Sequence, residues 1–396
     1  MVAIYLQGEK QSGMWDDLLH RAMRATQGQE ATDPFHKSQA LSRAPVVDFV
    51  NKLLEDAAAA GASDIHLEPG REDSRIRFRI DGELREVQGA IPLRLHAFLV
   101  ARLKVMAGLD TTERRTPMDG RIQYRYADEE RVLDVRVATM PMLSGEKAVL
   151  RLLDGEHGLR SLERLDFSPE NAVRFRKLIH ATGGLLLICG PTNSGKTTTL
   201  YAAMHELNDI SRNITTLEDP PEIHLPGINQ MQVNEKTGLT FAKGLRAILR
   251  ADPDLIMVGE IRDGETAEIA VRAALAGRLI FSTIHTGHAV GAIPRLLDMG
   301  VPPYLLASAL LGTVAQRLVR RRCKDGEGFR GRLALHEVMV MDDLMRTAIM
   351  ERRDAAELEK IAAAQGMVSM LEDGREKAAQ GLTTLAEVER VLYGGE

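Results

Sequence analysis

A glycine-rich run in the middle of the chain constrains its fold more than any other part of the sequence. The run fits the pattern G-x-x-x-x-G-K-[S/T], and it follows the apolar segment 185–189, which is typical of a buried strand. Two glycines let such a loop wrap closely, so that backbone N–H groups and the N-terminus of the next helix face phosphate oxygens. We therefore expect a strand, loop and helix that bind ATP, with Lys196 at the β- and γ-phosphates and Thr197 at Mg²⁺. The expected nucleotide-binding residues are Gly190, Pro191, Thr192, Asn193, Ser194, Gly195, Lys196, Thr197 and Thr198.

The composition indicates a globular protein of a reducing compartment, with the cytoplasm as the expected location. A chain of 396 residues is too long for one ordinary core, so we expect two or three domains. Its 51 Lys and Arg against 56 Asp and Glu give a net charge of −5, which argues against nucleic acid as the main partner. Cys189 and Cys323 are too few for a disulfide framework. We see no signal peptide and no apolar run of about eighteen residues, so membrane contact is expected only through partners.

Changes of pattern along the chain predict four regions. Residues 1–40 form a polar extension with one helical candidate over 15–25, which is a possible partner-docking element. Residues 41–154 predict a small α+β domain, and the polar stretch 155–168 predicts a linker. From 169 to 396 strands alternate with longer helical patterns, as in a mostly parallel sheet covered by helices, with a helical C-terminal end. In the small domain we expect helices over 45–61 and 93–106 and strands over 63–68, 75–80, 82–87, 121–126, 132–139 and 148–153.

A second apolar segment, 255–260, ends in a carboxylate downstream of the glycine-rich loop. We expect it to be a strand beside the loop, with Glu260 as the catalytic base that orients a water for in-line attack on the γ-phosphate. The alternative is a solvated charge at a strand end. Many P-loop enzymes carry a Mg²⁺-linked aspartate where this chain has Gly259. The β-rich segment 213–222 offers Glu218 and Asp219 instead, as metal ligands that act directly or through water.

Further polar residues follow or flank these strands. His285 comes directly after the apolar segment 279–284 and is placed to sense the γ-phosphate, although a hydrogen-bonded structural histidine is an equal alternative. Phosphoryl transfer needs cations at the γ-phosphate, so some arginines should act as arginine fingers, while most arginines are simply solvated. The candidates are Arg246, Arg250 and Arg262 around the second motif and Arg136 and Arg151 on strands of the first domain.

Taken in order, these motifs closely resemble those of the type II secretion and type IV pilus assembly ATPases, the general secretory pathway protein E family. The resemblance spans most of the chain and includes the Asp box, the atypical Walker B and the His box of the family. The matching segments are 60–69, 77–82, 115–121, 216–222, 254–263, 274–286, 316–320 and 331–338.

The resemblance implies an α/β fold, a RecA-like P-loop ATPase domain with a smaller N-terminal α+β (PAS-like) domain. It further implies a homo-hexamer with ATP at the subunit interfaces. Turnover would drive pseudopilin assembly through an inner-membrane platform, with the protein cytoplasmic and peripheral at that membrane. Carried over to this chain, the family's functional residues are Lys196, Thr197, Glu260, Arg136, Arg151, Arg246 and Arg250.

The chain also departs from the family pattern. Many members have a four-cysteine zinc subdomain, whereas here only Cys323 remains in that region, so we expect no zinc. Arg278 replaces the first histidine of the His box. The region before Pro45 is shorter than the one by which many members dock to the platform.

Three alternatives to a type II secretion motor remain open at this point. A type IV pilus assembly or retraction ATPase would share the same motifs. A DNA-stimulated translocase is disfavoured by the net charge and by the low aromatic content of 4%. A regulatory nucleotide-binding subunit is disfavoured by the intact Lys196, Thr197 and Glu260. ATP hydrolysis that does not depend on DNA would separate these classes.

Overall fold

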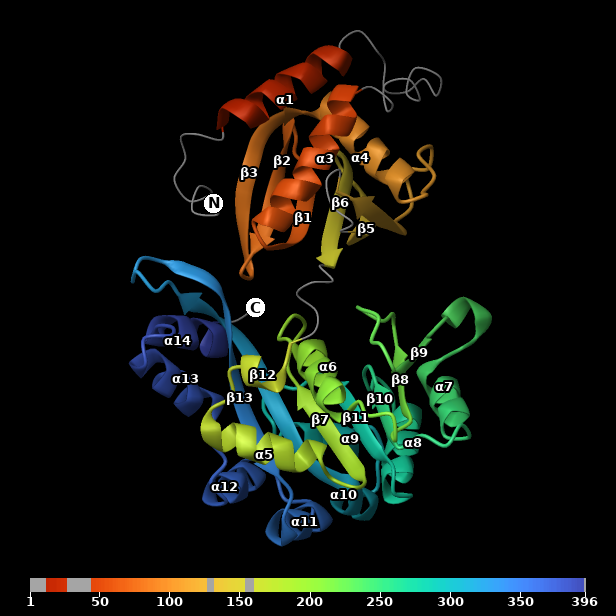
Figure 1. Ribbon diagram of the computed structural model, residues 1–396, viewed down its shortest axis with the longest axis vertical. Helices are drawn as coiled ribbons and strands as arrows, with labels where there is room; N and C mark the ends of the chain where they lie inside the picture. Colours follow the sequence, from red (N-terminus) through yellow and green to blue (C-terminus); the bar gives the residue numbers. More distant parts are fainter. Residues whose placement is uncertain (1–11, 27–43, 127–131, 154–159, 395–396) are drawn as a thin grey trace. The chain divides into compact units, whose positions relative to one another are not determined.

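The chain forms two compact units, Met1–Glu156 and His157–Glu396, which are described separately (Figure 1). A computed structural model of the chain describes residues 12–26, 44–126, 132–153 and 160–394. Parts of the predicted extension 1–40 and of the predicted linker 155–168 therefore lie outside the described residues.

Unit 1 is a six-stranded antiparallel sheet in the order β3-β2-β1-β6-β5-β4, with helices packed on one face (Figure 1). Alternation along the strands explains this layering: in β1, Ile65 and Leu67 are buried in the core, while His66 and Glu68 point to the opposite face. Its elements are α1 (Ser12–Thr26), α3 (Ala44–Ala59), β1 (Ala62–Pro69), β2 (Asp73–Ile80), β3 (Glu83–Pro92), α4 (Leu93–Met106), β4 (Met118–Arg125), β5 (Val132–Met142) and β6 (Gly145–Leu153).

Helix α1 contains the helical candidate of the N-terminal extension, and its apolar face packs inside unit 1. Trp15 meets Phe49 of α3 edge to face, with ring centroids 5.2 Å apart. Leu18, Leu19 and Ala22 are buried in the same core. A docking role for this helix, which stays a prediction, would therefore use its polar face.

Unit 2 is built on a seven-stranded sheet in the order β13-β12-β7-β11-β10-β8-β9. Its strands pair in parallel, except that β13 runs antiparallel to β12. Its elements are η2 (Leu162–Arg164), α5 (Pro169–Ile179), β7 (Gly184–Cys189), α6 (Lys196–Leu207), β8 (Ile214–Glu218), β9 (Asn229–Gln232), η3 (Glu235–Thr237), α7 (Phe241–Ile248), β10 (Leu255–Val258), α8 (Gly264–Leu275), β11 (Leu279–Ile284), α9 (Ala292–Asp298), α10 (Pro303–Ala309), β12 (Leu310–Arg322), β13 (Phe329–Val340), α11 (Asp343–Met350), α12 (Ala355–Ala364), α13 (Met370–Ala379) and α14 (Leu385–Tyr393).

Helices cover both faces of this sheet, which explains why every residue of β7 and β11 is buried. Leu186 and Ile188 of β7 pack with α5 and α6 on one face. Leu185, Leu187 and Cys189 pack with α7 to α10 on the other. A continuous apolar strand is therefore what this position in the sheet requires.

The strand order corrects one expectation. We expected the strand before Glu260 to lie beside the strand of the glycine-rich loop, but β11 lies between β7 and β10. His285, which follows β11, therefore stands between the loop and Glu260 along the edge of the sheet. Pairing between distant strands decides this order, and no local pattern reveals it.

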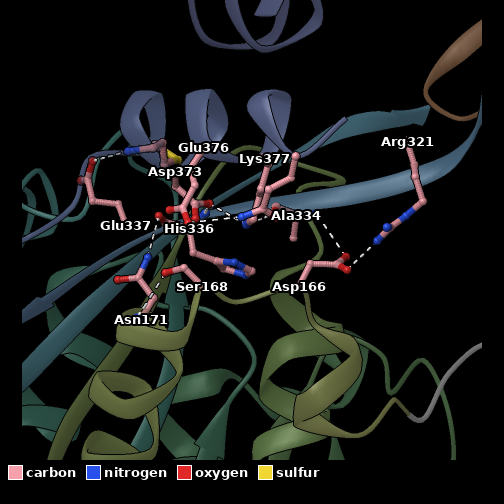
Figure 2. A network of polar contacts seen from close by, with 12 residues as sticks. Asp166, Ser168, Asn171, Arg321, Ala334, His336, Glu337, Asp373, Glu376 and Lys377 are labelled. Atoms are coloured by element: carbon pink, nitrogen blue, oxygen red, sulfur yellow. Dashed lines mark hydrogen bonds and ion pairs between the residues drawn. The ribbon is translucent and has the colours of Figure 1, made fainter. Parts of the chain in front are cut away.

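A buried polar network fixes β13 to α13 and α5 (Figure 2). Asp373 accepts the backbone N–H of His336 at 2.9 Å and the ammonium group of Lys377 at 2.7 Å. Lys377 also donates to the carbonyl of Ala334 at 2.7 Å, and the Asn171 amide donates to the carbonyl of His336 at 3.2 Å. Because buried polar groups are costly unless paired, these bonds hold β13 in one position.

The C-terminal end of unit 2 consists of the helices α11 to α14, of which α13 and α14 pack against the β12–β13 hairpin. These helices are short, with 8 to 10 residues each. In the parts of the chain that the structure describes, we find no helix long and apolar enough to cross a membrane.

Candidate active site

The polar residues singled out in the sequence lie after neighbouring parallel strands of unit 2. The glycine-rich loop follows β7, Asp219 follows β8, Glu260 follows β10 and His285 follows β11. Parallel strands end at one edge of their sheet, and this is where α/β proteins bind ligands. The edge therefore gathers the loop, two carboxylates and an imidazole.

The glycine-rich loop has the backbone of a phosphate cradle. Gly195 caps the N-terminus of α6 with φ of 88°, Gly190 has φ of 152° and Asn193 has φ of 62°. Glycine adopts such angles without strain, and asparagine tolerates the left-handed region. The hydroxyl of Ser194 is buried and has no hydrogen-bond partner among the described residues. A helix N-terminus with an unused hydroxyl fits a phosphate group.

Lys196 is folded back onto its own loop. Its ammonium group donates to the carbonyls of Gly190 at 2.8 Å and Pro191 at 2.7 Å. Burial lowers the pKa of Lys196, while the nearby charge of Glu260 raises it. A phosphate that enters the loop would compete with the two carbonyl oxygens for this ammonium group.

The carboxylate of Glu260 lies between the guanidinium of Arg262 and the imidazole of His285. Arg262 donates to one carboxylate oxygen at 2.6 Å, and Nε2 of His285 lies 3.5 Å from the other. Burial raises the pKa of Glu260, but the hydrogen bond and charge of Arg262 together with His285 outweigh it and leave the pKa below its usual value. Glu260 is therefore ionised at neutral pH, as a proton acceptor must be.

Hydrogen bonds between β10 and β11 set the position of Glu260. The hydroxyls of Ser282 and Thr283 donate to the carbonyls of Val258 and Gly259, both at 2.7 Å. The N–H of Ile261, on the other side of Glu260, donates to the carbonyl of Thr283 at 3.0 Å. The backbone around the carboxylate is thus held from the strand that delivers His285.

The two expected metal ligands differ in their surroundings. Glu218 is buried, and its carboxylate accepts hydrogen bonds from Tyr201, Thr216 and the Gln230 amide. Asp219 is partly exposed and lies 3.6 Å from Arg262. These contacts favour Asp219 over Glu218 as a metal ligand, because the oxygens of Glu218 are already engaged. Within the described residues, we find no cluster of three or more His, Cys, Asp or Glu that could hold a metal ion.

Arg246 and Arg250 are exposed, and their contacts described here are with α8 and α7 rather than with the loop. Arg246 pairs with Glu265 at 2.6 Å, and Arg250 donates to the carbonyl of Arg246 at 2.9 Å. Arg262 was named among the arginines around the second motif, but not among the functional residues that the family resemblance implies. Arg262 contacts Glu260. Only its closeness to Glu260 in the sequence could have indicated this.

Arg136 and Arg151 belong to unit 1. They lie opposite each other on β5 and β6, and Arg151 also pairs with Asp64 of β1 at 3.1 Å. The three side chains are on the face of the sheet away from the helices, because cross-strand partners share a face.

Residues 39–390 match the family model described as "Type II/IV secretion system protein". The chain belongs to this family. Among curated family proteins, "Type II secretion system protein HxcR" of Pseudomonas aeruginosa is 50% identical, covering 88% of this chain and 77% of that protein. "Type II secretion system ATPase E" of Vibrio cholerae is 45% identical, covering 88% of this chain and 75% of that protein.

A solved family structure shows the same fold. The pilus retraction motor PilT with bound ADP has a TM-score of 0.63 and 29% sequence identity, covering 85% of this chain and 95% of that chain. The predictions of a secretion ATPase family, of a P-loop α/β fold and of ATP hydrolysis are therefore confirmed. The chain is an ATP-hydrolysing secretion motor that binds nucleotide.

Proposed function

We propose that this family member is the ATPase motor of a type II secretion system. The observation that carries the ATPase part of the proposal is the meeting of the loop, Glu260 and His285 at one edge of the sheet. The relatives named for type II secretion reach 45–50% identity, compared with 42% for "Type IV pilus assembly ATPase PilB" of Thermus thermophilus and 29% for the PilT structure, and this difference supports type II secretion over the pilus alternative. The motor would act in the cytoplasm at an inner-membrane platform, without nucleic acid as a partner.

In the proposed site, ATP lies in the loop of residues 190–198. Lys196 moves from the Gly190 and Pro191 carbonyls to the β- and γ-phosphates. Thr197 and, through water, Asp219 would hold Mg²⁺, which usually takes few protein ligands beside phosphate oxygens and water. Mg²⁺ would neutralise charge on the phosphates when bound. We propose no zinc site.

Glu260 would orient the attacking water and accept its proton. Its lowered pKa keeps it ionised, and the backbone bonds from β11 keep it in place. His285, 3.5 Å from the carboxylate, would sense the γ-phosphate. An imidazole between the loop strand and Glu260 is suited to report whether the phosphate is present.

We propose that four arginines complete the site across subunit interfaces. Arg246 and Arg250 are exposed and contact α8 and α7 of their own unit rather than the loop. We propose that they, with Arg136 and Arg151, stabilise the transferring phosphate across subunit interfaces of a homo-hexamer. A cation supplied in trans is a recurrent device in phosphoryl transfer.

Mixing two inactive variants tests the shared site. Arg151→Ala and Glu260→Gln should each be nearly inactive alone. If Arg151 acts in trans, an equimolar mixture of reassembled rings should regain about a quarter of the wild-type rate, because random assembly leaves about one interface in four intact. The measurement is ATP hydrolysis with the oligomeric state determined in the same samples.

A mixture of Lys196→Ala with Glu260→Gln is the matched control. One subunit supplies both Lys196 and Glu260 to a site, so no subunit in this mixture has both residues intact. The mixture should stay inactive. Recovery there, or no recovery with Arg151→Ala, would argue against a site shared between subunits. Full activity of Arg151→Ala alone would remove this residue from the mechanism.

Deleting the gene in the organism that encodes the chain tests the secretion system. We expect loss of a set of secreted proteins, restored by the wild-type gene but not by Glu260→Gln, with surface pili unchanged. Proteomics of the medium and electron microscopy of the cells are the measurements. Loss of pili with normal secretion would establish the pilus alternative instead.

A further inference from the structure

Gln316 lies behind the nucleotide-binding loop, on a strand that contributes none of the expected site residues. It sits in β12, which pairs with β7 so that Ala315 is opposite Cys189, the last residue before the loop. The residue is only 3% exposed. Gln316 therefore extends the sheet beneath the loop rather than facing the nucleotide.

Both glycines that frame the loop are in close contact with this one residue. A Cβ atom on Gly190 would lie 2.7 Å from the backbone oxygen of Gln316. A Cβ atom on Gly195 would lie 2.6 Å from its amide nitrogen. The contact at Gly190 is with backbone and would be a clash, so the loop can approach the Gln316 backbone there only because the residue is glycine, whereas at Gly195 the close atom is the end of the Gln316 side chain.

A buried hydrogen bond adds a third contact. The hydroxyl of Thr199, in the first turn of α6, donates to the side-chain carbonyl of Gln316 at 2.6 Å. Thr199 is itself buried. Gln316 thus touches the start of the loop, its end and the helix whose N-terminus faces the phosphates.

The strand that carries Gln316 is firmly held. Gln316 lies opposite His336 of β13, and β13 is fixed by the buried network around Asp373 and Lys377 (Figure 2). A rigid support is what a residue needs to set the geometry of a loop.

We propose that Gln316 is a positioning residue for nucleotide binding. It holds Gly190, Gly195 and Thr199 at the spacing in which the loop amides and the α6 N-terminus converge on the phosphates. The proposal rests on the proposed binding of ATP in this loop. Because Gln316 acts on the loop and not on the reacting atoms, its effect is on nucleotide affinity rather than on the chemical step.

Gln316→Met and Thr199→Val test this, since both preserve shape and remove the hydrogen bond. Each should raise Kd for ATP and ADP, and KM for ATP, by about threefold to tenfold, with little change in kcat. The double variant should bind no more weakly than either single variant, because both lose the same bond. Thr199→Ser keeps the hydroxyl and should restore near-wild-type affinity. Fluorescent nucleotide binding and steady-state kinetics are the measurements.

Thr383→Val is the matched control. Its buried hydroxyl also bonds to β12, at the Arg320 carbonyl at 2.8 Å, but it does not touch the loop. This variant should lose stability without losing ATP affinity.

Wild-type affinity in Gln316→Met, or strictly additive effects of Gln316→Met and Thr199→Val, would overturn the proposal. Lys196→Ala, measured in parallel, separates the role of Gln316 from the proposed binding of ATP in the loop. If Lys196→Ala also binds ATP normally, the loop is not the ATP site, and the proposed function itself is contradicted.

Discussion

Glu260→Gln is expected to lower kcat for ATP hydrolysis by about 10²- to 10⁴-fold, the range that a general base contributes. The amide keeps the shape of the side chain and can still meet Arg262 and His285, but it cannot take a proton from water. Affinity for ATP should change little, because Lys196 and the loop amides hold the phosphates while Glu260 acts on the attacking water. Kinetics under saturating ATP, together with direct nucleotide binding, measure the two quantities separately.

The pH dependence of the wild type offers an independent check on the same residue. Because Arg262 and His285 hold the pKa of Glu260 below its usual value, protonation of this carboxylate should lower kcat only at pH values below the usual glutamate range. Glu260→Gln should remove that fall in its residual activity. Unchanged kcat in Glu260→Gln would assign the base to another group.

Lys196→Ala is expected to weaken ATP binding on the order of 100-fold, since charge-assisted bonds to phosphate are lost. The thermal stabilisation that ATP gives the wild type should disappear. Saturation at a hundred times Kd stabilises a protein by about 2.7 kcal/mol, which is readily seen as a rise in Tm. Differential scanning fluorimetry with and without ATP is the measurement.

Removing the lysine also leaves the carbonyls of Gly190 and Pro191 without their donor. The variant must therefore be compared with wild type in the absence of nucleotide. A lower Tm without ATP is expected from that loss alone and does not count against the role of Lys196. A rise in Tm with ATP as large as that of the wild type would contradict the role of Lys196 in ATP binding.

Local sequence patterns were sufficient to locate the elements of unit 1 and the strands of unit 2 that precede the site residues. The helix expected over 93–106 coincides with α4, and the strand expected over 279–284 coincides with β11. Both have strong signals: an apolar face in α4 and an unbroken apolar run in β11, which lies buried in the sheet. The glycine-rich loop is located by its motif, because phosphate contact demands those residues at that spacing.

What the patterns missed depends on contacts between distant residues. The insertion of β11 between β7 and β10 is a matter of strand pairing. The hydrogen bonds of Tyr201 and Gln230 to Glu218, which bear on its prediction as a metal ligand, join separate elements in the same way. Neither local propensity nor a short motif carries such information, since these partners come from separate elements.

The contact of Gln316 with the nucleotide-binding loop also bears on how the protein is made. Gln316 lies 117 residues after Thr199, its hydrogen-bond partner, and β12 is the direct neighbour of β7. A chain leaving the ribosome exposes the loop motif long before this strand emerges. The nascent protein therefore carries an unfinished ATP site through about half of the synthesis of unit 2, and a truncated product that ends before β12 would have the motif without its support.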